Sequence, residues 1–560
     1  MPEPQGPGFP SPQRAWAILA LLCAAYLLLA IGSLRHKSVT VDELGHLPAG
    51  YYYLRSGDPR HLGSNPPLAN VISAAPVLLM GLEPQGTIPP TLGNLTYSFW
   101  GNGYRFLFEH PDDYRRAYTA ARITTVLLVA GLGVLLFLWG RALAPRRPEL
   151  CGLMAAGLLW FSPGVLAHAR LVTTDAAAAL LVALALWSLW RALRRPGYPG
   201  FLLCGTLLGL AQLTKFYALL LYPLFVIVAA VWQRGADRRQ VRQVAGGLLA
   251  AFVLSVLVLD AGYLFQGVGT PLGDLELRSA RLQAATAWIP AAVPLPVPPA
   301  FVSALDEQMV EVTADNPSFL YGRTFEGGRW YYYLALLPIK TPLPLMLVLL
   351  LAAGYAVHRK PWSMRELSVL LLLPLALFLA LSLSSQRQLG VRALLSAAPL
   401  VWLWVAATLS RVALDRWARR TLIVLLLWAG GETLWIHPHY LTYFNQLVGG
   451  TSRGYRYASG SNLDWGQDLQ GLKQFMQAEG EETIQLLYFG SVDPAVYGID
   501  YEVPLESIRP GLLAVSVSLY HQPYAMYDHG IFRQVGPVDR DRLGTPIATV
   551  GNSIHIYRIR

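Results

Sequence analysis

The sequence predicts an α-helical polytopic membrane protein with a small α/β domain at its C-terminal end. Of the 560 residues, 54% are hydrophobic and only 14% are charged, whereas soluble proteins carry about 25% charged residues. The apolar residues are gathered in runs close to the roughly 20 residues that cross a bilayer as a helix. These runs are apolar on all sides, whereas helices of soluble proteins show polar stripes. Composition and patterning together argue against a large soluble protein.

The formal charge of +10 does not indicate a nucleic-acid-binding protein. The basic residues lie in short loops between apolar runs, not in a stripe with interleaved aromatic residues. The three cysteines, Cys23, Cys151 and Cys204, all fall in apolar runs, so we expect neither a structural disulfide nor a zinc site in the C-terminal domain. The first run begins at Ala15 without a small-residue cleavage site and is therefore expected to be a span, not a cleaved signal peptide.

About eleven segments have the length and composition of transmembrane helices. Basic loops set their orientation, because short cytoplasmic loops carry the excess of Lys and Arg. Alternate loops hold most of these charges, for example Arg146–Arg147 and Arg359–Lys360, which places these loops and the N-terminus in the cytoplasm. The expected spans are residues 15–34, 120–140, 150–167, 173–191, 200–213, 217–232, 244–263, 341–357, 367–384, 393–409 and 420–436.

This orientation divides the chain into three parts. Residues 1–14 are rich in Pro and Gly and are expected to be a disordered cytoplasmic N-terminus. Residues 15–436 form the transmembrane domain of a plasma (inner) membrane protein, with two long outer loops, 35–119 and 264–340. Residues 437–560 form the extracytoplasmic α/β domain, with an expected helix at 466–477 and expected strands at 483–489, 512–519 and 554–559.

Two adjacent carboxylates, Asp42 and Glu43, follow the first span, and His46 comes one helical turn after Asp42. Ionisable groups at a membrane are costly to keep and are therefore candidates for function. Asp42 could accept a proton from an attacking hydroxyl. One alternative is a helix cap at Thr40 or Asp42. Another is a metal site of Asp42, Glu43 and His46, although their spacing matches no closed metal motif.

A further carboxylate, Asp175, begins the fourth span within Thr173–Asp175, where it could equally be an N-cap. Three cations, Lys215, Arg387 and Arg392, stand on the outer side against the positive-inside pattern. An outward cation beside apolar helices suits a lipid phosphate, and Arg suits bidentate phosphate binding. Ordinary snorkelling at span ends is the alternative explanation.

The Pro-rich stretch 65–70 leads into an apolar segment, 71–82, that is too short for an expected span. We expect it to form a helix along the outer membrane face, with a further crossing as the alternative. The loop 264–340 is expected to cover a site at this face. Its residues Glu307, Glu311 and Tyr321 could contribute to that site without an assigned role.

These motifs, in this order, resemble the membrane glycosyltransferases of the protein O-mannosyltransferase and aminoarabinose transferase superfamily. Residues 40–58 with Pro66–Leu68 are similar to the first outer loop of that superfamily. Asp175 resembles its second acidic position, and Lys215 resembles a lysine used near the donor phosphate. Segments that resemble recurring pieces of the bacterial branch are Lys340–Pro342, Gly390–Arg392 and Asn462–Leu469.

The resemblance implies a GT-C fold and an inverting transfer of a sugar from a polyprenyl-phosphate carrier to an acceptor at the outer face. It implies Asp42 as the base, with Glu43 and Asp175 as groups that orient the acceptor or support the base. Lys215, with Arg387 or Arg392, would bind the donor phosphate.

His46 and Asn65 are further candidates for contact with the acceptor or for support of the site. Ser64 and Asn65 stand where aminoarabinose transferases are expected to carry charged residues, which argues against an aminoarabinose donor and against a metal ligand at that position. The only cofactor considered is a divalent metal cation. Asp464 and Trp465 could bind a sugar, but anchoring of the C-terminal domain is the favoured role.

Two other functions compete with a glycosyltransferase. A transporter or flippase of lipid-linked sugars would need charged or broken-helix sites near the bilayer midplane, often in paired halves. A non-catalytic scaffold would not need Asp42, Asp175 and Lys215 together. The sequence leaves open the sugar and the acceptor, which could be a lipid, a glycan or a protein hydroxyl. Residues 94–96 have the form of an N-glycosylation acceptor, which we expect to be incidental.

Overall fold

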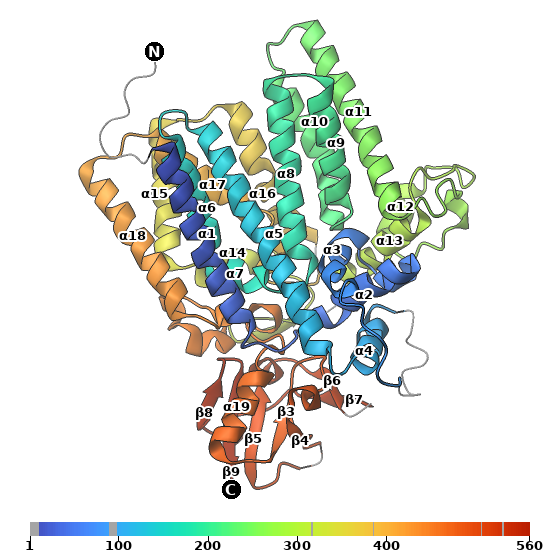
Figure 1. Ribbon diagram of the computed structural model, residues 1–560, viewed down its shortest axis with the longest axis vertical. Helices are drawn as coiled ribbons and strands as arrows, with labels where there is room; N and C mark the ends of the chain where they lie inside the picture. Colours follow the sequence, from blue (N-terminus) through green and yellow to red (C-terminus); the bar gives the residue numbers. More distant parts are fainter. Residues whose placement is uncertain (1–10, 89–97, 315–316, 385, 506, 529–530) are drawn as a thin grey trace.

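The computed structural model describes residues 11–88, 98–314, 317–384, 386–505, 507–528 and 531–560. A tall bundle of helices stands on a small α/β domain, and a layer of short helices lies beside the junction (Figure 1). The predicted fold class, a helical membrane protein with a C-terminal α/β domain, is confirmed. The predicted glycosylation acceptor at 94–96 lies outside the described residues.

Each expected span corresponds to one helix or to a pair of consecutive helices. Among the described residues, five helices are long and apolar enough to cross a membrane, or up to seven if each bent pair counts once, so eleven spans stay a prediction. The bends are 65° between α6 and α7 and 113° between α14 and α15. The elements are α1 Pro12–Leu34, α5 Tyr114–Leu143, α6 Pro148–Trp160, α7 Pro163–Ala169, α8 Thr174–Arg194, α9 Tyr198–Gln212, η3 Phe216–Leu220, α10 Leu221–Trp232, α11 Arg238–Gly262, α14 Tyr332–Lys340, α15 Leu343–Arg359, α16 Met364–Ser384, α17 Ala398–Arg411 and α18 Arg416–Trp435.

The first helix begins earlier than expected. Ser11 accepts a hydrogen bond from the Arg14 N–H, and Pro12 occupies the first helical turn, a position that proline favours. Residues 12–14, predicted to be disordered, are therefore helical, and residues 1–10 lie outside the described part of the chain.

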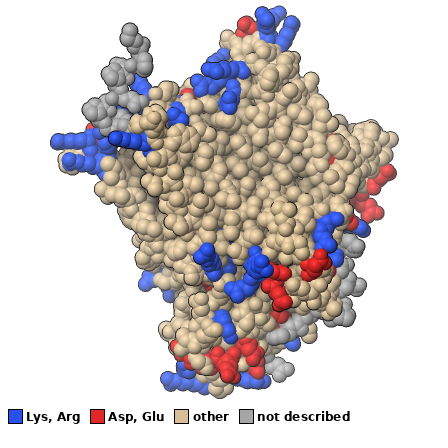
Figure 2. Space-filling view, in the orientation of Figure 1, with Lys and Arg blue, Asp and Glu red and all other residues tan. Residues whose placement is uncertain are grey.

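The surface of the bundle is that of a multi-pass membrane protein. On the face shown in Figure 2, a broad area is free of charged side chains, and Lys and Arg gather at the end away from the C-terminal domain. Large apolar side chains such as Leu21, Leu249 and Leu427 are exposed along the helices. Such extended apolar surface is unfavourable in water but is covered by lipid in a bilayer.

The two long loops fold into short helices. The first loop forms α2 Glu43–Ser56, η1 Pro59–Leu62, α3 Pro67–Leu78 and α4 Phe99–Glu109, and the second forms α12 Ala280–Thr286, α13 Pro299–Thr313 and the hairpin β1 Pro317–Leu320 with β2 Arg323–Glu326. The 12-residue α3 is too short to cross a bilayer, as predicted. It packs on α2 at Gly50, where a Cβ would lie 2.2 Å from the Asn70 carbonyl oxygen, so only glycine permits this approach.

The C-terminal domain is built on a five-stranded sheet in the order β4-β3-β5-β9-β8. The β3–β4 and β3–β5 pairs are parallel, whereas β5–β9 and β8–β9 are antiparallel. A hairpin of β6 and β7 stands apart from this sheet. The elements are α19 Leu469–Glu479, β3 Thr483–Leu487, β4 Asp500–Glu502, β5 Gly511–Ser516, β6 Tyr524–Asp528, β7 Ile531–Val535, β8 Ala548–Val550 and β9 Ile554–Ile559.

The expected helix at 466–477 starts three residues later than predicted. Gly466 has a φ of +81°, outside the helical region, and residues 465–467 form hydrogen bonds with the first loop. The three predicted strands are present, but β5 ends at Ser516 because the chain turns into η11 Val517–Tyr520.

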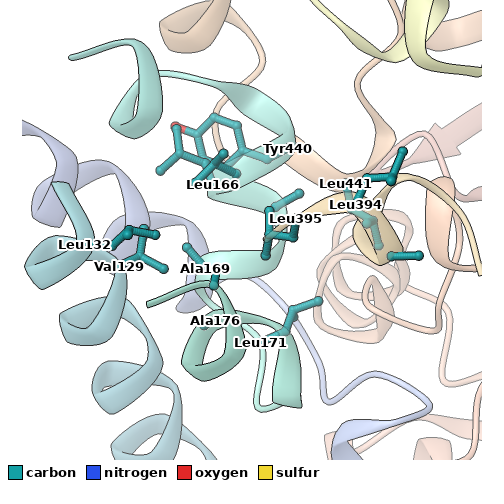
Figure 3. Close-up of a cluster of buried hydrophobic side chains, with 14 of the residues drawn as sticks. Val129, Leu132, Leu166, Ala169, Leu171, Ala176, Leu394, Leu395, Tyr440 and Leu441 are labelled. Atoms are coloured by element: carbon teal, nitrogen blue, oxygen red, sulfur yellow. The ribbon is translucent and has the colours of Figure 1, made fainter. Parts of the chain in front are cut away.

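A buried apolar cluster surrounds α7 (Figure 3). Leu166 and Ala169 of α7 pack among apolar side chains of α5, α8, η5 Val391–Leu394 and the segment after α18. The start of α8, which carries Asp175, is fixed by the same cluster.

The turn before Asp42 is held by a buried ion pair. Arg122 of α5 contacts both carboxylate oxygens of Glu43, at 2.8 and 2.5 Å, and donates to the carbonyls of Lys37 and Ser38. Glu43 also accepts from the backbone N–H groups of Thr40 and Val172. Burial alone would raise the pKa of Glu43, but Arg122 and these N–H groups lower it below its ordinary value.

We predict that Glu43→Gln destabilises the protein by about 3–5 kcal/mol, because it leaves the buried Arg122 charge unpaired. Since the pKa of Glu43 is lowered in the folded state, its contribution is present above the unfolded-state pKa and is lost as pH falls. Thermal unfolding in nanodiscs should therefore show a smaller gap between variant and wild type in acid. Glu502→Gln, which removes an exposed pair with Arg509, is the control and should change little. An equal effect of the two substitutions would contradict the prediction.

Candidate functional site

A cavity of about 650 Å³ opens where the helix bundle meets the layer of short helices, and we name it the donor cavity. Its walls come from the start of α2, η1, the start of α4, the start of α8, α13 and the loop before α17. The predicted residues that line it are Asp42, His46, Asn65, Lys215, Glu307, Glu311, Arg387 and Arg392. The second long loop forms part of the wall through α13, as predicted.

Four of the predicted residues form one chain of alternating charges. Lys215 is paired with Asp175, Asp175 Oδ2 lies 3.6 Å from Arg392 Nη1, and Arg392 Nη2 lies 2.9 Å from Asp42 Oδ2. Asp175 is 1% exposed, whereas the side chains of Asp42 and Lys215 are 19% and 18% exposed. The two terminal members are thus the most accessible to a ligand.

The capping alternatives do not explain these aspartates. Asp42 occupies the N-cap position of α2, but its side chain makes no capping hydrogen bond. Thr173 is the N-cap of α8, also without a side-chain cap, and its hydroxyl donates to Asp175 Oδ2 at 3.0 Å. Glu43, the first residue of α2, accepts from the N–H and the hydroxyl of Thr40, which precedes the helix.

Arg392 is positioned by the C-terminal segment that resembles the bacterial branch. Gly390 has a φ of +79°, and a Cβ there would lie 2.4 Å from Asn462 Oδ1, which accepts from the Val391 N–H at 3.1 Å. The Arg392 guanidinium lies 4.3 Å from the centre of the Trp465 ring. Burial would lower the pKa of Arg392, but Asp42 and Asp175 raise it above its ordinary value, so Arg392 stays charged.

Lys340 has a structural role. Its ammonium donates to the carbonyls of Leu441, Tyr443 and Asn462, at 2.9, 2.7 and 2.7 Å. These contacts tie α14 to the chain that leads into the C-terminal domain. Lys340 therefore holds the segment 462–465 through the Asn462 carbonyl. The same segment supports Arg392 through Asn462 and Trp465.

His46 lies at the wall of the donor cavity. Its Nδ1 is 2.9 Å from Asn70 Oδ1, and its ring packs edge-on against Phe99. Burial lowers the pKa of His46, and the nearby Asp42 offsets this only in part, so the imidazole is neutral at pH 7. It can therefore exchange a hydrogen bond with a bound ligand without adding charge.

Three predicted site residues, Glu43, Arg387 and Tyr321, lie outside the chain of charges. Glu43 points toward Arg122 and does not line the donor cavity, so it cannot contact an acceptor or join Asp42 and His46 around a metal. Arg387 lines the cavity but pairs with Glu311 at 2.8 Å, outside the chain of charges. Tyr321, in the turn between β1 and β2, does not line it.

The residues present do not fit a divalent cation. Asp42 and Asp175, the carboxylates in the chain of charges, are both engaged by cationic side chains. Across the described ranges, no cluster of three or more His, Cys, Asp or Glu could hold a metal ion.

A second, apolar cavity of about 400 Å³ lies within the bundle, and the sequence gave no sign of it. It is lined by α7, α14, α15, α16, α17 and the residues of η5 next to Arg392, and its wall is almost entirely hydrocarbon. Val391 and Leu394 of η5 line this cavity, whereas Arg392 lines the donor cavity. A single turn of chain therefore connects the apolar space to the charged one.

Asp464 and Trp465 have different environments. Asp464 is fully buried and accepts from the N–H groups of Ser518 and Gly466, at 3.2 and 3.3 Å, so its role is in packing. Burial raises the pKa of Asp464 to about 7. Trp465 is buried between Arg392 and the domain, and its carbonyl accepts from the Val41 N–H.

Residues 83–267, a third of the chain, match the family model of dolichyl-phosphate-mannose-protein mannosyltransferases. This part of the N-terminal half of the chain is similar to these enzymes. The match confirms the predicted resemblance, and it contains Asp175 and Lys215 but neither Asp42 nor Arg392. A comparison with curated proteins gave no match.

Several solved structures are similar to the chain as a whole or in part. ArnT from Cupriavidus metallidurans bound to undecaprenyl phosphate has 13% identity and a TM-score of 0.46, with 97% of each chain covered. The Pmt1-Pmt2 protein O-mannosyltransferase complex of S. cerevisiae has 19% identity and a TM-score of 0.32, with 47% of this chain and 36% of that chain covered. The Archaeoglobus fulgidus oligosaccharyltransferase has 16% identity and a TM-score of 0.40, with 76% and 56% covered. Because the identities are below 20% and the TM-scores are below 0.5, these structures do not assign a function, which must be argued from the residues of this chain.

We predict that Asp464→Asn stabilises the protein relative to wild type as pH rises. Since the pKa of Asp464 is raised to about 7 in the folded state, its contribution to stability is fully present below the unfolded-state value and is lost as pH rises through 7. Thermal unfolding at pH 5 and pH 8 should show a relative gain for the variant on the order of 2 kcal/mol between the two conditions. The exposed Asp500→Asn is the control. A gap that does not depend on pH would show that Asp464 is ionised throughout this range.

Proposed function

We propose that this protein is a GT-C glycosyltransferase that moves a sugar from a polyprenyl-phosphate donor to an acceptor, with inversion at the anomeric carbon. The chain of charges from Lys215 through Asp175 and Arg392 to Asp42 carries the proposal, because it joins a cation and a carboxylate at the wall of one cavity. The similarity of residues 83–267 to mannosyltransferases supports it.

The donor lies with its phosphate at Lys215 and its lipid chain toward the apolar cavity. The Lys215 ammonium is paired with Asp175, and a phosphate oxygen reaching the cavity offers it a second anionic partner. As the bond between the anomeric carbon and the phosphate oxygen breaks, negative charge grows on the phosphate. A cation in a site of low dielectric stabilises that charge more than water does.

Asp42 is the base. Arg392 engages Oδ2 of its carboxylate, and the side chain is partly exposed to the donor cavity, so an acceptor hydroxyl can donate to it. The acceptor oxygen bonds to the anomeric carbon as the phosphate leaves from the opposite side, and the hydroxyl proton passes to Asp42. The sugar passes through an oxocarbenium-like transition state, as in other glycosyl transfers. The wall made by α13 limits water, which would otherwise hydrolyse the donor.

Asp175 and Glu43 position the reacting groups without contacting the substrates. Asp175 fixes both Lys215 and Arg392, and Glu43 fixes the turn that carries Asp42, so both are positioning residues. The site faces the outer side of the plasma (inner) membrane, with the N-terminus in the cytoplasm. The Lys and Arg side chains at the other end of the bundle support this orientation (Figure 2).

A flippase of lipid-linked sugars is the competing function. It would place its charged groups near the middle of the membrane-spanning helices. In the described structure, the charges that line the donor cavity lie at the ends of the helices, beside the layer formed by the loops. This position favours a transferase.

The deciding experiment measures release of polyprenyl phosphate, and transfer of label, from a labelled polyprenyl-phosphate sugar with a membrane extract as acceptor source. We predict that Asp42→Asn lowers transfer by about 10²–10⁴-fold, because the acceptor loses its base, while donor binding persists. Asp112→Asn, at an exposed position, is the control and should behave as wild type. Equal release by Asp42→Asn and wild type would remove Asp42 as the base, and no release by any protein would favour the flippase.

We predict that Lys215→Met lowers the rate of transfer by about 10²–10³-fold, because the leaving phosphate loses its cation. Binding of polyprenyl phosphate itself should weaken in parallel, as measured by thermal-shift titration. Lys473→Met, in α19 of the C-terminal domain and outside both cavities described above, serves as the control. Normal phosphate binding by the Lys215 variant would exclude it as the phosphate ligand.

A further inference from the structure

A third cavity, of about 690 Å³, lies between the C-terminal domain, α4 and the loop 387–392, and we name it the aromatic cavity. It meets the donor cavity at the pair formed by Asp42 and Arg392. The residues that line both cavities are Asp42, Trp100, Arg387, Leu389 and Arg392. Lys215 lines the donor cavity but not the aromatic cavity, whereas Asp42 lines both. The proposed base therefore faces the residue that binds phosphate in one cavity and a second, separate cavity on its other side.

The walls of this cavity are aromatic. The rings come from four separate parts of the chain, namely α4, the segment before α19, the segment after β3 and the β6–β7 hairpin, which lies beside α4 in Figure 1. Trp100 and Phe532 are 42% and 47% exposed, so their rings are available to a ligand. The aromatic residues of the wall are Trp100, Tyr104, Trp465, Phe489, Tyr524 and Phe532.

Hydrogen bonds through Ser491, and packing between neighbouring rings, hold several of these rings in place. Tyr104 Oη donates to the Ser491 carbonyl at 3.0 Å, and the Ser491 hydroxyl bonds Tyr524 Oη at 2.6 Å. Phe532 packs edge-on against Tyr104, with ring centres 5.5 Å apart. Ring positions fixed in this way lose little entropy when a ligand stacks on them.

Beyond the charged groups that it shares with the donor cavity, the wall adds no charged side chain among the described residues. In the described part of the chain, its charged side chains are Asp42, Arg387 and Arg392, all shared with the donor cavity. The other polar side chains are the amides and hydroxyls of Gln388, Ser461, Ser491 and Gln522. The volume lies within the range of about 300–1,000 Å³ that is usual for small-ligand sites.

We propose that the aromatic cavity binds the acceptor and that the acceptor is a neutral glycan. The C–H faces of a pyranose ring stack on aromatic rings, and its hydroxyls bond to uncharged amides and hydroxyls. A peptide would be recognised mainly through its backbone. An anionic lipid head group would meet, among the described residues of this wall, only the cations Arg387 and Arg392, which are already paired with Glu311 and Asp42. A hydroxyl of the terminal sugar then reaches Asp42 at the inner end of the cavity. This inference depends on the proposed glycosyl transfer and names its second substrate.

The test compares Phe532→Ala with Ile531→Ala. Both residues are exposed and neighbours in β7, but only Phe532 lines the aromatic cavity. The assay uses the labelled polyprenyl-phosphate sugar with a graded amount of membrane extract, and the labelled product is divided by protease digestion, organic extraction and glycosidase digestion. We expect label on protease-resistant carbohydrate and, for Phe532→Ala, an apparent acceptor KM raised on the order of tenfold, with binding of polyprenyl phosphate unchanged. Phe532→Tyr should restore the wild-type KM, and Ile531→Ala should keep it.

Label released by protease, or extracted as a lipid without a glycan, would overturn the assignment of the acceptor. Identical acceptor KM values for Phe532→Ala and Ile531→Ala would overturn the assignment of the cavity, and Gln522→Ala provides a second variant should Phe532→Ala unfold. Failure of the proposed function itself looks different, because wild type would then release no polyprenyl phosphate at any amount of extract.

Discussion

The buried ion pair between Glu43 and Arg122 fixes the turn that carries Asp42, and the other parts of the site are arranged around that turn. Arg122 reaches from α5 to the carbonyls of Lys37 and Ser38, so the segment after α1, the start of α2 and α5 share one set of contacts. Such a pair is stable when buried only if every hydrogen-bonding group finds a partner, as both carboxylate oxygens of Glu43 do here.

The same rule explains the arrangement of the site itself. Two carboxylates and two cations sit close together in a poorly solvated space, and they are tolerated because the signs alternate. The arrangement is neutral as a whole, yet Lys215 and Asp42 at its ends are the most accessible members. A phosphate at one end and a hydroxyl at the other would each meet the group that their chemistry requires.

The C-terminal domain is part of this site and not only an appendage. Its first segment pairs with the loop before α2, through Ser38 to Gln467 and Val41 to Trp465, and Lys37 is paired with Asp468. Asn462 and Trp465 support the loop of Arg392, and the β6–β7 hairpin closes the aromatic cavity. Removing the domain would therefore release Asp42 and Arg392 together.

The sequence by itself determined the helical, multi-pass fold class and predicted all four residues that meet in the chain of charges. Each apolar run predicts a helix on its own, because each segment that crosses the lipid must itself be apolar. Asp42, Asp175, Lys215 and Arg392 could be singled out because a charged group at the end of such a run costs free energy and is therefore a candidate for function. The role of Glu43 was decided only by the tertiary structure, since adjacent carboxylates look equivalent until Arg122 engages one of them. The tertiary structure also decided three further features, namely the pairing of Arg387 with Glu311, the start of α19, and the short strands β4, β6, β7 and β8. The cavities were also decided only by the tertiary structure, because their walls join residues hundreds of positions apart. No local pattern in a sequence records contacts over that distance.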